Sequence, residues 1–304
     1  MKRLNNKILL IVLVVLLGGF LVSKMFRTPA LESNLPTDLF GVDTTKITEV
    51  HVNPEVERGE IKLVRHGEEW SLQKGDKTAD PELALIKNAL GGLQYVRPTK
   101  MMSRRKEKWS EYKVDSTGTH VQVYDEDEVL ADWWIGKAGS GEVYVRLNDK
   151  EDVYAIRGMM RNYFNKGFND WRDKTFIRIE PDTITKITFQ YPVDTGFVVA
   201  KADTLWTING QPADPLKVSR YLNTVQYKSL TEFADNFSPV VSPDVTIVFE
   251  SNGVSMQTVQ AWKQEEDRWI MGSSGKQGIY FSNEGSTIIK DLFQAQKDFQ
   301  SGSE

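Results

Sequence analysis

The chain has 304 residues, of which 40% are apolar and 26% charged, and its formal net charge is −4. This composition is typical of a globular protein, and the length allows about two domains. The weak negative charge argues against a nucleic-acid-binding protein, which usually carries a basic face. Because the chain contains no cysteine, disulfides, thiolate nucleophiles and cysteine-ligated metal sites are excluded.

The first predicted element is an apolar segment close to the N-terminus. Residues 1–7 include three basic side chains, and an unbroken apolar run follows from Ile8 and is extended by Met25 and Phe26. Its length is at the short end of the roughly 17–25 residues that a transmembrane helix needs, so a cleaved signal peptide is the alternative. No small-x-small cleavage site follows the run. We therefore expect a transmembrane anchor at 8–26, with 1–7 in the cytoplasm.

After a proline-containing linker at 27–40, the pattern predicts a first α+β segment at 41–168. Apolar and polar residues alternate at 47–52 and 61–66, as in half-buried strands. A Trp-bearing strand and the sequence Ala-Asp-Pro at 79–81 come next, which predicts a helix from Pro81 capped by Asp80. The predicted apolar stripe of that helix is Leu83, Ile86, Leu90 and Leu93. Two hairpins (120–137 and 142–157) and a closing helix (157–168) complete the segment.

The same order of elements recurs at 169–300. The stretch EEWSLQKGDKTADPE at 68–82 is echoed by DTLWTINGQPADP at 203–215. Asp214 is therefore the expected cap of a second helix, which has the apolar stripe Val218, Tyr221, Leu222 and Val225. Hairpins follow at 246–263, where Asn252-Gly253 is a strong turn signal, and at 267–282. A closing helix at 286–299 ends the segment.

The repeat predicts the fold class and separates structural from functional candidates. We expect an N-terminal transmembrane helix followed by two tandem, similar α+β domains with mainly antiparallel sheets and helices on one face. Trp70 and Trp206 occupy equivalent positions in the two copies. They are therefore interpreted as core residues rather than ligand contacts.

The segment FNDWRDKTFIRIEPDTITKITF at 168–189 resembles the bacterial family known as domain of unknown function 4340. The resemblance is carried by Arg172-Asp173 and by Ile184, Lys186 and Ile187, with a weaker match at residues 111–115. It implies a membrane-anchored protein of the bacterial envelope, of a kind often associated with ABC transporter components of the gliding-motility type. It provides no catalytic residues to carry over.

The candidates for site chemistry favour structural interpretations. The acidic run at 125–128 lacks the glycine and downstream glutamate of a calcium loop, so a solvated hairpin turn is expected. The glycine-rich stretches at 137–142 and 272–278 do not end in Gly-Lys-Ser/Thr, and flexible hairpins are expected there. The three histidines are interpreted as exposed. No catalytic residue, metal site or cofactor is predicted.

Two features are candidate partner contacts. Trp133 and Trp134 are adjacent on a predicted strand, so one must face the core and the other must face away from it. Arg104 and Arg105 belong to a basic cluster in the middle of the first copy. That cluster is expected to be a solvated loop, which lipid headgroups or a partner could use.

Taken together, the sequence predicts a non-enzymatic, single-pass protein of the bacterial inner membrane with most of the chain in the periplasm. The expected role is an accessory or scaffold subunit of an ABC-type transport or gliding-motility-like envelope complex. Its expected partners are the bilayer, through 8–26, and transporter permease or auxiliary subunits, with no nucleic acid. A module that binds an envelope glycan or polymer is the alternative. A hydrolase is the least favoured hypothesis.

Overall fold

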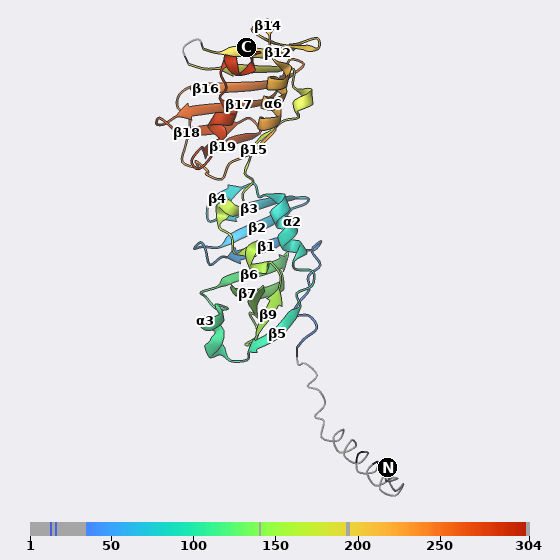
Figure 1. Ribbon diagram of the computed structural model, residues 1–304. Helices are drawn as coiled ribbons and strands as arrows, with labels where there is room; N and C mark the ends of the chain where they lie inside the picture. Colours follow the sequence, from blue (N-terminus) through green and yellow to red (C-terminus); the bar gives the residue numbers. More distant parts are fainter. Residues whose placement is uncertain (1–12, 14–15, 17–34, 140, 193–194, 302–304) are drawn as a thin grey trace, which may run out of the picture. The chain divides into compact units, whose positions relative to one another are not determined.

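Antiparallel sheets dominate the chain in the computed structural model, which describes residues 13, 16, 35–139, 141–192 and 195–301 (Figure 1). The predicted span at 8–26, apart from Leu13 and Leu16, lies outside the described residues, as do the predicted tail at 1–7 and most of the linker. Within the described part of the chain, no helix combines the length and the apolar character needed to cross a bilayer.

The first sheet has nine strands in the order β4-β3-β2-β1-β6-β7-β8-β9-β5. An antiparallel ladder runs from β2 through β1, β6, β7, β8 and β9 to β5. The strands are β1 (Glu49–Asn53), β2 (Ile61–His66), β3 (Glu69–Lys74), β4 (Lys77–Ala79), β5 (Pro98–Ser103), β6 (Thr119–Asp125), β7 (Glu128–Gly139), β8 (Glu142–Leu147) and β9 (Val153–Arg157). The helical elements around them are α2 (Leu83–Gly91), η1 (Lys106–Lys108), α3 (Trp109–Tyr112) and α4 (Met160–Phe164).

Alternation along these strands sends every second side chain to the core. Val50, Val121 and Trp133 lie on three neighbouring strands and are fully buried. Helix α4 covers the same face at β6 and β7 and buries Met160 and Phe164. The other face of the sheet carries the intervening polar and aromatic side chains, most of which are half-buried or exposed.

The second sheet has eight strands in the order β14-β13-β12-β11-β16-β17-β18-β19, and a separate two-stranded sheet pairs β10 with β15. The strands are β10 (Thr175–Arg178), β11 (Lys186–Gln190), β12 (Phe197–Ala202), β13 (Leu205–Ile208), β14 (Gln211–Pro212), β15 (Tyr227–Ser229), β16 (Val245–Ser251), β17 (Val254–Lys263), β18 (Trp269–Ser273) and β19 (Lys276–Ser282). The helical elements are α5 (Phe168–Trp171), η2 (Pro181–Thr183), α6 (Pro215–Val225), α7 (Ile288–Leu292) and η3 (Gln296–Phe299).

The described chain divides into two compact units. The first takes the described residues up to Glu69 together with Ile86–Lys166, and the second takes Trp70–Leu85 together with the described residues from Gly167 onward. The expected sheet-rich α+β class with mainly antiparallel pairing is confirmed. The ranges 41–168 and 169–300 stay predictions.

The central hairpins of the two sheets have matching registers. Val121 opposes Trp133 across β6 and β7, and Ile247 opposes Val259 in the same way across β16 and β17. Both hairpin turns place a residue in the left-handed region, Glu126 in the first and Asn252 in the second. The expected turn at the acidic run is therefore confirmed.

Helix α6 matches its prediction. It begins at Pro215, and the carboxylate of Asp214 accepts hydrogen bonds from the amides of Leu216 and Lys217 at 2.9 and 3.4 Å. This satisfies two of the amides that a helix leaves unpaired in its first turn. All four residues of the predicted apolar stripe are buried.

The corresponding helix of the first copy begins later than predicted, at Leu83 instead of Pro81. The backbone before it is committed elsewhere, because the Glu82 amide donates to the Trp171 carbonyl and Pro81 forms a bridge with Arg172. The Asp80 carboxylate lies 3.3 Å from the Lys276 ammonium instead of capping the helix. The buried residues of α2 are Ile86 and Ala89, and Leu83 is exposed.

The core assignment of Trp206 is confirmed, because its half-buried ring packs against the core of the second unit. Trp70 is half-buried too, and each Trp shares its strand face with a fully buried residue two positions along the chain, Leu72 or Ile208. One further expectation needs correction, because the closing helices are shorter than 157–168 and 286–299 and consist of α4 in the first copy and of α7 with η3 in the second.

The two aspartates give a matched test. Asp214→Ala should destabilise the first turn of α6 by about 1 kcal/mol, because two amides lose their acceptor. Asp80→Ala should cost less than about 0.5 kcal/mol, because its carboxylate is 73% exposed in a single ion pair. Hydrogen exchange of the Leu216 and Lys217 amides checks the first effect. Equal protection in the two variants would contradict the cap assignment.

Candidate functional site

A row of aromatic and charged side chains crosses the outer face of the first sheet. His120 on β6 opposes Trp134 on β7, and Trp134 opposes Arg146 on β8. The guanidinium of Arg146 in turn lies 3.8 Å from the centre of the Trp109 ring. These four residues, His120, Trp134, Arg146 and Trp109, are called the outer row below. Directly opposed residues on one face of an antiparallel pair are close neighbours, so the register itself assembles the row.

Trp134 is held in a defined orientation. Its ring stacks on that of His120 with centroids 4.3 Å apart and planes 15° from parallel. Its indole nitrogen donates a hydrogen bond of 2.9 Å to the side-chain oxygen of Asn148. The neighbouring Trp133 is fully buried. The expected opposite orientation of the two tryptophans is therefore confirmed, while their contact with a partner stays a prediction.

Asp132 ties the supporting side chains together. Its carboxylate accepts hydrogen bonds from Gln122 and Asn148 at 3.0 Å each, and it lies 2.7 Å from the Nε2 atom of His120. Since an ionised carboxylate only accepts hydrogen bonds, Nε2 of His120 is the donor. The rings of His120 and Trp134 are thus both fixed by hydrogen bonds at their edges.

Arg146 carries a positive charge and is nevertheless buried, with only 3% of its surface exposed. Its guanidinium donates to the carbonyls of Val114, Leu147, Asn148 and Lys150 at 2.9–3.2 Å. Burial lowers the pKa of Arg146, and the nearby Asp132 and Asp115 oppose that change. The side chain therefore fixes the turn after β8 while it supports two tryptophan rings.

A hollow of about 500 Å³ opens beside the row. Trp134 and His120 line it together with Asn53, Glu55, Arg58 and Thr117. Burial alone would raise the pKa of Glu55, but hydrogen bonds from Lys113 and Arg161 hold it below its ordinary value. Glu55 is therefore ionised at neutral pH and committed to two cations. The hollow offers polar edges beside an aromatic surface.

Arg104 and Arg105 lie in the exposed loop between β5 and η1. The Nε atom of Arg104 is 3.0 Å from the sulfur of Met101, and the Arg105 amide donates to Ser103. The loop continues into Lys106, whose ammonium lies 5.2 Å from the centre of the Trp109 ring. Trp109 thus links the predicted basic cluster to the outer row, and the two candidate contact features are structurally connected.

Sequence reasoning missed part of this site. His51 and His120 were expected to be exposed, but their side chains are only 13% and 17% exposed and each lies 2.7 Å from a carboxylate oxygen. Glu49 precedes His51 by two residues on the same strand, whereas Asp132 lies on the strand beside that of His120, which the sequence of a single strand does not reveal. The burial of Arg146 could have been inferred only from its position between the apolar residues Val145 and Leu147 on β8. No described residues form a group of three or more histidine or carboxylate side chains suited to a metal ion.

The outer row belongs to the first copy alone. With Val121 and Trp133 aligned to Ile247 and Val259, the registers place Thr246, Gln260 and Gly272 at the positions of His120, Trp134 and Arg146. The equivalent positions of the second sheet therefore carry no aromatic ring and no charge. Residues that the packing of the fold requires should recur in both sheets. A position whose residue differs between the two sheets is therefore not determined by that packing.

The Arg172-Asp173 pair, which carries the family resemblance, is structural in the second unit. Arg172 is 6% exposed, donates to both carboxylate oxygens of Asp235 at 2.8 and 2.9 Å, and lies 3.5 Å from the centre of the Phe233 ring. Asp173 forms an ion pair with Lys276 at 2.7 Å. Both side chains hold together segments that are distant in sequence.

Replacement of Arg146 should destabilise the first unit. Arg146→Met leaves four carbonyl oxygens without their donor, and we expect the free energy of unfolding to fall by about 3 kcal/mol. Arg157→Met, on the exposed face of β9, should change it by less than about 0.5 kcal/mol. Urea unfolding followed by tryptophan fluorescence measures both. An Arg146→Met protein as stable as the Arg157→Met control would refute the anchoring role.

The Asp173–Lys276 pair predicts a pH dependence. Burial alone would raise the pKa of Asp173, but hydrogen bonds from Lys276 and Thr175 lower it from its ordinary 3.8. Its contribution is therefore complete above that value and is lost as the pH falls through the folded-state pKa. Asp173→Asn should destabilise by about 1–2 kcal/mol at pH 7.

The gap between the urea midpoints of wild type and Asp173→Asn should be smaller at pH 3 than at pH 7, because Asp173 begins to lose its stabilising charge below 3.8. Asp203→Asn, in an exposed turn, is the control and should match wild type at both pH values. A gap between wild type and Asp173→Asn that stays constant down to pH 3 would show that the charge on Asp173 is not the source of the stabilisation.

The comparisons with known proteins support the resemblance. A family model with the description "Domain of unknown function (DUF4340)" matches residues 86–242, which is more than half of the chain. The matched segment runs from α2 past β15 and contains Arg172 and Asp173. No curated protein and no solved structure matches the chain. The chain therefore belongs to the DUF4340 family.

Proposed function

We propose that this protein is a non-enzymatic, membrane-anchored accessory subunit whose folded part lies outside the cytoplasm and binds a partner through the outer row. The partner class we propose is a permease or auxiliary subunit of an ABC-type transport or gliding-motility-like complex. The single observation that carries the proposal is Trp134, a large half-buried aromatic side chain set among fixed polar neighbours, at a position where the second sheet carries Gln260.

The residue types of the outer row and their fixed orientation favour binding to a protein. Tryptophan and arginine are the residues most often found at energetic centres of protein interfaces. Trp134 is already oriented by His120 and Asn148, so a partner would not have to order it. The basic loop at Arg104 and Arg105 joins the same region through Trp109. An aromatic centre with a charged rim is the usual composition of such contacts.

The membrane part of the proposal rests on the sequence. The apolar run at 8–26 follows basic residues and precedes a linker, which is the arrangement expected of an anchor with its N-terminus in the cytoplasm. An anchored subunit is confined to the plane of the membrane. A modest contact area then suffices for association, because confinement raises the effective concentration of the partner.

A second candidate function is binding of an envelope glycan or polymer. The hollow beside Trp134 favours it, since an aromatic face next to polar edges suits a sugar ring with its apolar faces and hydroxyl rim. Asn53, Arg58 and Thr117 would supply hydrogen bonds there. Both hypotheses place Trp134 at the contact, so they are separated by what Trp134 touches.

Crosslinking in native membranes tests the two candidates. A photoreactive phenylalanine analogue at position 134 should form a crosslink to a polytopic membrane protein. The same analogue at Gln260, the equivalent position of the second copy, should not. Trp134→Ala should weaken partner retention by about 2 kcal/mol, and Gln260→Ala should leave it unchanged.

The opposite pattern would decide against the accessory-subunit proposal. If no protein is captured at position 134, while isolated envelope glycan retains the wild-type chain and releases Trp134→Ala, the glycan-binding function replaces it. If Trp134→Ala affects neither partner nor glycan retention, the outer row is not a contact site.

A further inference from the structure

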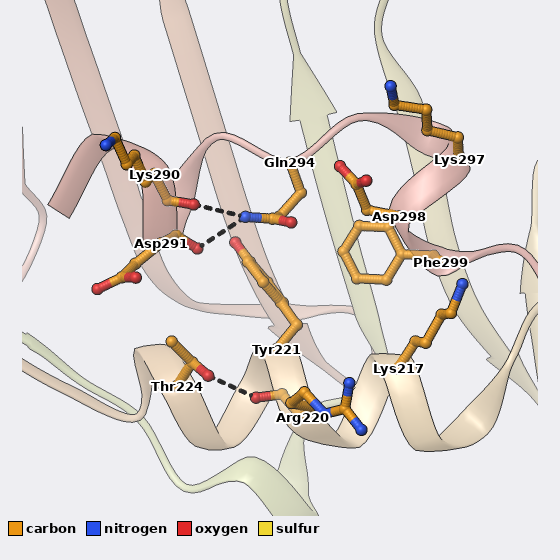
Figure 2. Close-up of a pocket in the computed structure, with 10 residues that line it drawn as sticks. All are labelled: Lys217, Arg220, Tyr221, Thr224, Lys290, Asp291, Gln294, Lys297, Asp298 and Phe299. Carbon is orange, nitrogen blue, oxygen red and sulfur yellow. Dashed lines mark hydrogen bonds between the residues drawn. The ribbon is translucent and has the colours of Figure 1, made fainter. Parts of the chain in front are cut away.

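A hollow of about 390 Å³ lies in the second unit between α6 and the C-terminal segment formed by α7 and η3. Figure 2 shows α6 along one wall, with Lys217, Arg220 and Thr224, and the C-terminal segment along the other, with Lys290, Gln294 and Lys297. The aromatic rings of Tyr221 and Phe299 lie between the two walls.

The floor of this hollow is rigid and uncharged. Phe299 and Tyr221 are buried, and their rings meet edge to face with centroids 5.3 Å apart. The Tyr221 hydroxyl donates to the Leu292 carbonyl at 3.2 Å. Burial raises the pKa of Tyr221 well above its ordinary value, so the phenol stays neutral. The floor therefore ties α6 to the C-terminal segment and fixes the spacing of the walls.

The rim carries an excess of positive charge. Lys217, Arg220, Lys290 and Lys297 outnumber the two carboxylates, Asp291 and Asp298. Both carboxylates are already engaged, since Asp291 pairs with Lys228 at 2.6 Å and Asp298 accepts the Ala295 amide at 2.7 Å. This concentration of cations stands in a chain whose formal net charge is −4.

The neutral polar groups of the hollow are committed within the protein, as Figure 2 shows. The Gln294 amide nitrogen donates to the carbonyls of Lys290 and Asp291, and the Thr224 hydroxyl donates to the Arg220 carbonyl. Lys217 uses one of its three donors on the Gln300 carbonyl. Within the described residues, Arg220, Lys290 and Lys297 have no ion-pair partner within 4.0 Å. The donors left for a ligand are therefore cationic.

Two of the four cations have no charged counterpart on helix α2 of the first unit. Val218 and Tyr221 are the buried positions of α6 that correspond to Ile86 and Ala89 of α2. On this alignment, Lys217 and Arg220 correspond to Leu85 and Asn88. The shared fold needs no charge at these positions, so packing does not account for the cluster.

We propose that this hollow binds a phosphate group. An arginine fork together with flexible lysines suits a small tetrahedral oxyanion with several acceptor oxygens. The cations stand on two facing walls, so a phosphate between them can draw the long side chains inward from both through its non-bridging oxygens. The phosphate could be a lipid headgroup, whose diester carries one negative charge, or a soluble phosphate compound, and both present anionic non-bridging oxygens.

Calorimetry on the full chain in zwitterionic micelles tests the proposal. Inorganic phosphate is titrated in one arm, and phosphatidylglycerol in the other, with phosphatidylcholine as the lipid blank. The double variant Arg220→Gln/Lys290→Gln should weaken binding about tenfold or more. The control Lys201→Gln/Lys263→Gln removes the same charge from exposed strand positions and should bind within about twofold of wild type.

The titrations with inorganic phosphate and with phosphatidylglycerol together identify the source of the phosphate. Binding of inorganic phosphate that depends on Arg220 and Lys290 indicates a soluble ligand, and dependence seen only with phosphatidylglycerol indicates a headgroup. The proposal is overturned if wild type and the Arg220/Lys290 variant bind both ligands equally or bind neither. It is also overturned if acetate competes as well as phosphate, because the site would then select charge alone.

Discussion

The cross-strand register of β6, β7 and β8 is the constraint on which the candidate site depends. In an antiparallel sheet, a side chain faces either the core or the opposite side, and its neighbours on that side are set by the strand pairing. A shift of one residue along β7 would bring Trp134 into the core and expel Trp133. Because Trp133 fills the space under β7 against Phe40 and Phe164, the packing of the core also determines what the outer face displays.

The two sheets combine a similar pattern of buried residues with unlike exposed faces. The corresponding positions in the strands and in the helices α2 and α6 are buried, and these must stay apolar for each sheet to be covered. The positions that differ lie on the outer face of the first sheet and on the exposed side of α6. In the first unit they form the outer row, and in the second they contribute to the cationic hollow. One pattern of buried residues is therefore compatible with different exposed faces.

Patterns that are local in sequence predicted structure well, because the forces behind them are local. The hairpin at Asn252 and the cap at Asp214 each depend on a few neighbouring residues, and both formed as expected. Asp80, like Asp214, lies between Ala and Pro. It does not cap a helix, because the Glu82 amide donates to the Trp171 carbonyl and Pro81 forms a bridge with Arg172. His120 and the cationic hollow escaped prediction for a similar reason, since their partners lie on other strands or at the far end of the chain.

The way Arg146 is held has a consequence for the environment in which the outer row can work. The hydrogen-bond partners of its guanidinium are backbone carbonyl oxygens, and carbonyl oxygens do not titrate. A carboxylate partner, by contrast, is a group that acid can neutralise. The anchor beneath Trp109 and Trp134 therefore keeps its hydrogen-bond acceptors when the surrounding medium becomes acidic.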